Sequence, residues 1–276
     1  MCGFVGLLHL NNDVETNLGA IIDMNNAIHH RGPDDEGIVL FSFKGKRYQE
    51  ISQSNINRIS DSFEGAVGFK RLSIIDLSIN GHQPMIDYER NIILTFNGEI
   101  YNAFDYRDFL ISKGFKFRSK TDTEILLYMY EYFGWEVMLE KINGMFAICF
   151  IDLNSSSIML ARDRLGIKPL YYYQDNDIFM FSSEVKSFLF NQNFKSELKE
   201  SNIDEYTKFG YISGNETLLK NVYCVEPGQY MVITRDSIKK HIYWDMYNEN
   251  RSDEMSLVQA CELVEDEVKK SLRLMG

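Results

Sequence analysis

Short runs of β-branched and aromatic residues recur along the chain up to about residue 235 and predict a protein rich in strands. Two of these runs, MFAICFID and IFMFSS, are apolar on both faces, which is typical of sheets covered on both sides. The pattern therefore favours a layered α+β sandwich. Strands are expected at residues 3–8, 37–43, 66–75, 92–96, 145–152, 158–162, 170–173, 178–182 and 229–234.

Helical spacing of apolar residues predicts helices among these strands, at residues 20–29, 106–113, 122–133, 135–141 and 203–209. The helix at 122–133 has the clearest start, because Thr121 and Glu124 match the S/T-x-x-E capping box. Asp122 then lies in the first turn, where the helix dipole favours a carboxylate.

The last 41 residues differ from the rest of the chain. Residues 236–255 are polar and aperiodic, which predicts a linker. An amphipathic helix is expected from Ser256 onward, and two interpretations of it stay open: a helix that packs on another domain or a partner, or a terminal helix folded back on its own domain. Its apolar stripe consists of Leu257, Cys261, Val264, Val268 and Leu272.

The composition is that of a soluble globular chain, since 45% of the 276 residues are hydrophobic and 25% are charged. A net charge of −11 would repel a phosphate backbone, so nucleic acid is not expected as a partner. No apolar run approaches the roughly 18 residues of a membrane span, and the start MCGFVGLLHL lacks the features of a secretory signal. We therefore expect a cytoplasmic protein that acts on a small molecule and binds no membrane.

Metal and nucleotide sites are not expected in this chain. The four cysteines lie far apart without a C-x-x-C pair, which argues against a zinc site and against a disulfide framework. His29 and His30 are adjacent, and side chains that diverge by about 100° on a helix make a poor metal pair. Neither a P-loop pattern nor a G-x-G-x-x-G run occurs.

Cys2 is the strongest candidate for a catalytic residue. Removal of the initiator methionine would leave a cysteine with a free α-amine, so that one residue holds both a nucleophile and a base. With reference pKa values of about 7.7–8.0 for the amine and about 8.5 for the thiol, moving the proton between them costs only about 1 kcal/mol. Gly3 would let a substrate approach the backbone closely. An ordinary cysteine after the initiator methionine is the alternative that stays open.

Other residues could complete a site for an amide of an amino acid. Asn97 and Gly98 could supply a side-chain amide and a backbone N–H to an oxyanion, although Asn-Gly is also a common hairpin signal. Arg71 could hold a carboxylate or form a surface salt bridge. Asp122 could bind an ammonium group or merely compensate the helix dipole. The turn at residues 31–35 is either a structural loop or a binding loop.

In combination these motifs closely resemble the glutaminase half of glutamine-dependent asparagine synthetase. The resemblance runs from Cys2 to about Thr234 and implies an N-terminal-nucleophile hydrolase fold, a four-layer αββα sandwich of two antiparallel sheets. The motifs occur in this order: Cys2-Gly3, HHRGPDDEG, RLSIIDLSINGHQPM, FNGEIYN, SKTDTEILL, NGMFAICFID, ARDRLGIKPLYY, FSSEVKSFL and VEPG.

The resemblance also implies roles for single residues. Cys2, as the processed N-terminus, resembles the nucleophile that forms a glutamyl thioester, and Asn97 with the N–H of Gly98 resembles the oxyanion donors. Arg71 matches the residue that binds the glutamine α-carboxylate, while Glu99 and Asp122 match positions around the α-amino group. The backbone expected to line the same pocket is that of Leu72, Ser73, Ile74 and Ile75. Arg31 and its loop resemble a flap that closes over bound glutamine.

One large feature of the family is absent from this sequence. The synthetase domain of the family carries an S-G-G-x-D-S loop for ATP, and the ending KKSLRLMG resembles the segment shortly before it. We therefore expect a glutaminase domain at residues 2–235, a linker at 236–255, and the first helix of a missing synthetase domain at 256–276. No cofactor is expected in this chain, and ATP and Mg²⁺ are expected only for the missing domain.

The implied function is hydrolysis of L-glutamine to glutamate and ammonia for ATP-dependent asparagine synthesis. The expected partners are L-glutamine and a synthetase domain in the same or another polypeptide, and a homodimer stays open. The alternatives are a related amidotransferase that amidates another acceptor, such as a surface-polysaccharide sugar, a different amide hydrolase of this fold, and a non-catalytic structural partner.

Overall fold

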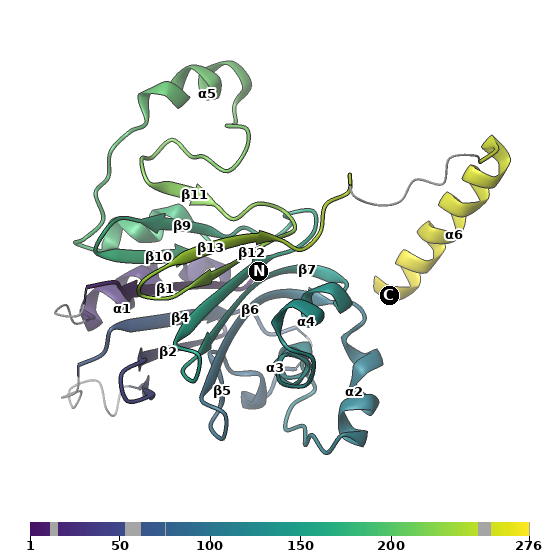
Figure 1. Cartoon of the computed structure of the whole chain (residues 1–276), viewed down its shortest axis with the longest axis horizontal. Coiled ribbons are helices and arrows are strands. Elements are labelled where there is room, and N and C mark those ends of the chain that lie inside the picture. Colours follow the sequence, from purple (N-terminus) through teal and green to yellow (C-terminus); the bar gives the residue numbers. More distant parts are fainter. Residues whose placement is uncertain (12–15, 53–61, 75, 248–254, 276) are drawn as a thin grey trace.

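The computed structural model describes residues 1–11, 16–52, 62–74, 76–247 and 255–275. Most of them form two stacked antiparallel sheets with helices on their outer faces (Figure 1). The first sheet has the strand order β11-β9-β10-β1-β4-β2-β3. Its strands are β1 (Gly3–His9), β2 (Asp35–Ser42), β3 (Arg47–Ile51), β4 (Gly65–Arg71), β9 (Tyr171–Gln174), β10 (Ile178–Ser182) and β11 (Val222–Cys224).

The second sheet has the strand order β13-β12-β8-β7-β6-β5. Every strand pair in both sheets is antiparallel. The strands of the second sheet are β5 (Met85–Asp87), β6 (Ile92–Ile100), β7 (Gly144–Asp152), β8 (Ser157–Arg162), β12 (Gln229–Ile233) and β13 (Ile238–Ile242).

Helices form the two outer layers. Helix α1 (Leu18–Ala27) and the 3₁₀ segment η4 (Val185–Phe190) pack on the first sheet. Three helices pack on the second sheet: α2 (Ala103–Ser112), α3 (Asp122–Phe133) and α4 (Trp135–Lys141) (Figure 1). The result is the predicted four-layer αββα arrangement. Helix α5 (Ile203–Phe209) lies in an excursion between β10 and β11, and short 3₁₀ turns occupy His29–Arg31, Ile79–Gly81 and Glu200–Asn202.

The core explains why the N-terminal strand is central. Strand β1 is buried on both faces, and its side chains alternate between two apolar clusters. Phe4 and Leu8 pack between the sheets, while Val5 and Leu7 pack against α1. Strand β1 also pairs with β4 on one edge and with β10 on the other, so Cys2 lies at the end of a strand with neighbours on both edges and both faces.

Most predicted elements are confirmed, with differences at their ends. The strand predicted at 66–75 ends at Arg71, and Ile75 lies outside the described residues. The strand predicted at 92–96 continues to Ile100. The helix predicted at 20–29 ends at Ala27 and is followed by a 3₁₀ turn. Strands β3, β5, β11 and β13 were not predicted, because they have only three to five residues each and carry too little alternation.

The C-terminal region differs from the expectation at the start of the predicted linker. Residues 238–242, inside the predicted linker, form strand β13 and pair with β12, so regular structure continues past residue 235. Helix α6 (Leu257–Met275) lies apart from the sandwich in Figure 1, and its apolar stripe is exposed. This structure does not show the helix packed on its own domain, and its role as the first helix of a synthetase domain stays a prediction. Among the described residues, no helix combines the length and apolarity needed to cross a membrane.

Candidate active site

A small cavity beside Cys2 collects most of the residues singled out in the sequence. The volume of this cavity is about 90 Å³. The sequence-predicted residues that line it are Cys2, Arg71, Leu72, Ile74, Gly98, Glu99 and Asp122. Asn97 lies in β6 between the lining residues Phe96 and Gly98, whereas Ser73 and Arg31 do not line the cavity. The fold thus brings a thiol, a guanidinium and two carboxylates to one place.

The Cys2 thiol contacts the backbone at the end of β4. The N–H of Leu72 donates to Sγ at 3.3 Å, and Sγ lies 3.5 Å from the Leu72 carbonyl oxygen. Burial raises the pKa of the thiol above its ordinary value, although the Leu72 hydrogen bond, the chain terminus, Arg71 and Lys168 each act in the opposite direction. A raised pKa disfavours the thiolate, so the thiol needs a base before it can attack a carbonyl.

Arg71 is buried, and backbone carbonyls hold its guanidinium. Nη1 donates to the Ser78 carbonyl at 3.1 Å, and Nη2 donates to the carbonyl of Asp76. These partners are neutral, so the interpretation of Arg71 as half of a surface salt bridge is wrong. A buried guanidinium among neutral acceptors can still attract an anion, which fits a carboxylate ligand in the cavity.

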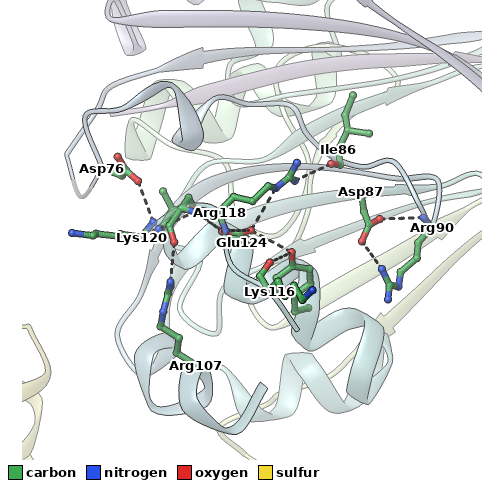
Figure 2. A network of polar contacts seen from close by, with 12 residues as sticks. Asp76, Ile86, Asp87, Arg90, Arg107, Lys116, Arg118, Lys120 and Glu124 are labelled. Atoms are coloured by element: carbon green, nitrogen blue, oxygen red, sulfur yellow. Dashed lines mark hydrogen bonds and ion pairs between the residues drawn. The ribbon is translucent and has the colours of Figure 1, made fainter. Parts of the chain in front are cut away.

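The loop that presents those carbonyls is fixed by the Asp76 side chain. Its Oδ1 accepts from Ser78 N at 2.8 Å, and its Oδ2 accepts from Lys120 N at 3.1 Å (Figure 2). Hydrogen bonds from Ser78 and Lys120 lower the pKa of Asp76 to about 2, so this carboxylate stays ionised. The segment after β4 is thereby tied to the segment before α3.

Asn97 and Gly98 lie inside strand β6, so the hairpin interpretation is wrong. They face Ala147 and Phe146 on β7 in an unbroken antiparallel pairing. A side chain at Gly98 would place its Cβ 2.3 Å from the Met145 carbonyl oxygen, so glycine is required by the close approach of β7. The side-chain Nδ2 of Asn97 is buried and has no hydrogen-bond partner among the described residues. A buried donor without a partner is costly, and a bound ligand that accepts a hydrogen bond from it would remove that cost.

Asp122 begins α3 and is only 4% exposed. Its Oδ2 accepts from Ile100 N at 3.1 Å. Burial raises the pKa of this carboxyl to about 6, with a smaller contribution of the same sign from Glu99, and backbone hydrogen bonds oppose the rise. Dipole compensation alone would lower the pKa, so it does not account for Asp122. A buried carboxylate on the wall of a cavity can gain much from a cationic ligand.

The predicted capping box at the start of α3 is half formed. Thr121 Oγ1 accepts from Glu124 N at 3.3 Å, as expected for the N-cap. The Glu124 carboxylate, however, does not return to Thr121 N, which donates to Ser119 Oγ instead. Glu124 accepts from Arg118 N at 2.8 Å and from Ser119 N at 2.6 Å, so it anchors the segment before the helix (Figure 2).

The turn at residues 31–35 does not line the cavity but contacts the end of β4 and the loop that follows it. Asp34 N donates to the Arg71 carbonyl at 3.1 Å, and Asp34 Oδ2 accepts from Ser73 N at 2.8 Å. Asp35 Oδ2 contacts His82 Nδ1 at 2.8 Å. This turn supports the loop after β4. The flap role of Arg31 stays a prediction.

Several supporting residues were missed in the sequence. Gln83 accepts from Phe96 N at 2.7 Å and donates to its carbonyl at 3.3 Å, which fixes the cavity end of β6. Lys168 is buried, with Nζ 3.6 Å from Met1 Sδ, beside the chain start. Only the Asx turn at Asp76 and Ser78 had a local signal, because the other contacts join residues far apart in the sequence.

A second, larger hollow of about 550 Å³ lies between the β5–β6 turn and α3. Asp87 and Arg90 line it, and Figure 2 shows their ion pair. No cysteine, serine or histidine lines this hollow, so the chemistry points to the smaller cavity at Cys2.

Comparison with known proteins agrees with this geometry. Residues 55–244 match a family described as a glutamine amidotransferase domain. Asparagine synthetase (glutamine-hydrolyzing) 1 of Bacillus subtilis is 37% identical over 238 residues, which cover 86% of this chain and 34% of that protein. Asparagine synthetase (glutamine-hydrolyzing) 2 of the same organism is 30% identical over 300 residues, covering 99% of this chain and 36% of that protein.

The solved structures show the fold. The glutamine phosphoribosylpyrophosphate amidotransferase from B. subtilis, complexed with ADP and GMP, matches with a TM-score of 0.64 and 20% identity. The match covers 91% of this chain and 50% of that one. This chain therefore shares its sandwich fold with that amidotransferase. The chain spans about a third of the two asparagine synthetases above. It belongs to the class II glutamine amidotransferase family, as an enzyme domain similar to parts of glutamine-hydrolysing asparagine synthetases.

Proposed function

We propose that this domain hydrolyses L-glutamine to glutamate and ammonia in the cavity at Cys2. The observation that carries the proposal is the meeting of the Cys2 thiol with a buried guanidinium and a buried carboxylate in one small cavity. A free amino acid has one anionic and one cationic end, and this cavity offers a partner for each. A bulky acyl amide without those charges would leave both partners unmatched.

The substrate would lie with its α-carboxylate on Arg71 and its α-ammonium near Asp122 and Glu99. Arg71 is suited to this role because the Asp76 and Ser78 carbonyls fix its guanidinium without neutralising its charge. Asp122 is suited because burial weakens its solvation, so an ammonium partner replaces what water would supply. The backbone of residues 72–74 would line the pocket between the two ends.

The reaction would proceed through a thioester. Once Met1 has been removed, the α-amine of Cys2 accepts the thiol proton, and Sγ attacks the side-chain carbonyl carbon of glutamine. The tetrahedral intermediate collapses, the C–N bond breaks, and the α-ammonium returns its proton to the leaving ammonia. Water, deprotonated by the same amine, then attacks the thioester and releases glutamate together with the free thiol.

The oxyanion of each intermediate would accept hydrogen bonds from Asn97 Nδ2 and from the N–H of Gly98. Asn97 is a strong candidate because its buried Nδ2 has no partner among the described residues. A donor that is already desolvated and held by a paired strand pays little to reorganise when charge develops on the carbonyl oxygen.

We propose further that the ammonia serves ATP-dependent asparagine synthesis, in a synthetase domain of the same or a partner polypeptide. The names of the relatives support this acceptor, as does the share of their length that this chain spans.

The test is glutaminase activity of protein whose loss of Met1 has been confirmed by mass spectrometry. We expect glutamate and ammonia in equal amounts, and covalent labelling of Cys2 by the glutamine analogue 6-diazo-5-oxo-L-norleucine. C2A is the matched control and should do neither. Processed protein that releases no glutamate and takes up no label at Cys2 would contradict the proposal.

A further inference from the structure

Arg31 connects Cys2 to an acidic residue that lies outside the cavity. Its Nε donates to the Cys2 carbonyl at 2.9 Å, and its Nη1 donates to Glu184 Oε1 at 3.0 Å. Arg31 is 9% exposed, whereas the Glu184 side chain is 24% exposed. The three residues form a chain of contacts that ends on the backbone of the proposed nucleophile.

The sheet places Glu184 at this end of the molecule. Strand β10 pairs with β1, and the pairing continues past the strand end, where Ser183 N donates to the Phe4 carbonyl at 2.9 Å. Glu184 follows directly, and its N–H donates to Ser182 Oγ at 3.0 Å. The carboxylate is thus fixed relative to the start of β1 by the same ladder that holds Cys2.

The space for Arg31 is provided by Gly3. A Cβ at this position would lie 2.7 Å from Arg31 Cδ and 2.8 Å from Nε. The expectation that Gly3 admits a substrate is therefore wrong, because the arginine side chain occupies that side of the backbone. The Cys-Gly start and the arginine at position 31 are structurally linked.

Glu184 is a suitable counter-ion for Arg31. Burial opposes ionisation of Glu184, but hydrogen bonds from Arg31, His30 and Lys186 together lower its pKa. His30 and Lys186 approach the same carboxylate with side chains that are 54% and 48% exposed. Arg31, by contrast, is buried and depends on a partner for its charge.

We propose that Glu184 is a positioning residue, which acts through Arg31 to hold the Cys2 backbone so that the thiol stays against Leu72. The proposal rests on the proposed function for its role in catalysis. Glu184 does not line the cavity, so it has no part in binding glutamine. Loss of the Glu184 carboxylate would leave the Arg31 guanidinium without its ion-pair partner and weaken the hydrogen bond from Arg31 to the Cys2 carbonyl. Sγ could then move away from Leu72 N.

The first experiment compares E184Q with K186M, both confirmed as processed. Lys186 contacts the other carboxylate oxygen of Glu184 at 3.2 Å from the solvent side, so K186M is a matched control that leaves the Arg31 contact in place. We expect E184Q to lower kcat at least tenfold with KM for glutamine within twofold of wild type, and K186M to leave both within twofold. A rise in KM with unchanged kcat for E184Q would overturn the proposal.

The second experiment measures alkylation of Cys2 by iodoacetamide across a range of pH. This reagent needs no amino-acid site, so it tests positioning even if the wild-type protein proves not to hydrolyse glutamine. Because Glu184 does not line the cavity and contacts Arg31 instead of the thiol, E184Q should change the maximal rate without moving the apparent pKa. An unchanged maximal rate in folded E184Q would overturn the proposal.

A double-variant cycle tests the route through Arg31. If Glu184 acts only through that residue, E184Q should cause less than a twofold further loss in the R31Q background. Independent, multiplicative losses would overturn the route. E184D keeps the charge and should fold even if E184Q does not. We expect E184D to retain more kcat than R31Q, and a KM effect in its place would contradict the proposal.

Discussion

Arg71 and Asp122 carry opposite formal charges on the walls of one cavity, and each is buried for a different reason. The arginine is held by two carbonyls of the loop after β4, whereas the aspartate begins a helix under the end of β6. Arg71 was singled out in the sequence as a possible partner of a carboxylate, and Asp122 as a carboxylate in the first turn of a predicted helix that could bind an ammonium group. Their shared cavity could not be predicted from the residues alone, because it requires the two sheets to be stacked.

Replacing Arg71 should mainly weaken glutamine binding. R71A removes the proposed partner of the α-carboxylate but leaves the thiol in place, so KM should rise by about tenfold or more, since a charge-assisted hydrogen bond contributes roughly 1.5–3 kcal/mol. Steady-state kinetics with glutamine measure this. A fall in kcat at unchanged KM would contradict the assigned role.

Replacing Asn97 should mainly slow turnover. N97A removes the proposed oxyanion donor, and loss of one such donor typically costs about 10²–10³ in kcat. KM should stay near the wild-type value, because the donor acts on charge that develops during the reaction. Measurement of kcat and KM for the same protein preparation separates the two effects, and equal kcat in N97A and wild type would refute the role.

Because of the raised pKa of Asp122, a fall in pH should weaken glutamine binding but stabilise the fold. Its folded pKa of about 6 exceeds the ordinary value of 3.8, so its protonated form stabilises the fold fully below pH 3.8, and that contribution is lost as pH rises through 6. Ammonium binding needs the ionised form, so KM for glutamine should rise as pH falls below about 6. D122N should bind glutamine weakly at every pH, and a D122N profile that still breaks near pH 6 would exclude Asp122 as the cause.

At the scale of elements, the capping motif at the start of α3 predicted the N-cap residue correctly but the hydrogen-bond partner of Glu124 wrongly. The sequence correctly predicted Thr121 as the N-cap and the helix bounds 122–133. It also predicted a reciprocal bond from Glu124, but this carboxylate is only 1% exposed and accepts from the backbone of Arg118 and Ser119. The competing donors lie before the motif, so its four-residue pattern could not reveal them.

This difference predicts unequal effects of two substitutions on stability. T121A removes one cap and should lower the free energy of unfolding by about 1 kcal/mol. E124A leaves several buried donors unsatisfied and should cost about 3 kcal/mol or more. Chemical denaturation of both variants measures the ranking. Equal losses would instead indicate a reciprocal capping box.

Strand ends and edge strands were the elements that sequence patterns described least well. Asn97 and Gly98 gave a turn signal, yet the glycine serves close packing against Met145 within a continuous strand. Strand β13 escaped prediction because most of its residues are exposed at a sheet edge, where alternation is weak. Long buried strands such as β7 were predicted well, since burial on both faces leaves a continuous apolar run.

At the scale of the whole molecule, the sandwich is complete without the C-terminal helix. Apart from the half-buried Ala260, the residues of α6 whose side chains are described are exposed. The αββα class could be predicted, because doubly covered strands and amphipathic helices permit few arrangements. The stacking of Cys2 beside Leu72 could not, because it depends on which strands become neighbours.

Removal of α6 should leave the sandwich intact. A chain that ends at residue 255 should keep its melting temperature within about 2 °C of the full chain, since the helix adds little buried surface. Its glutaminase activity per folded molecule should also be unchanged. Calorimetry and activity assays on the two chains test this, and a drop of 5 °C or more would show that α6 contributes to the core.

The central place of β1 has a consequence for how the chain is made. Synthesis proceeds from the N-terminus, and β1 is the first strand to leave the ribosome. One of its neighbours, β10, is not translated until residues 178–182, and the Glu184 that secures Arg31 emerges later still. The leading residues therefore remain unclamped until at least residue 184 has been translated, which gives an aminopeptidase acting on nascent chains time to reach Met1 before folding encloses its neighbour.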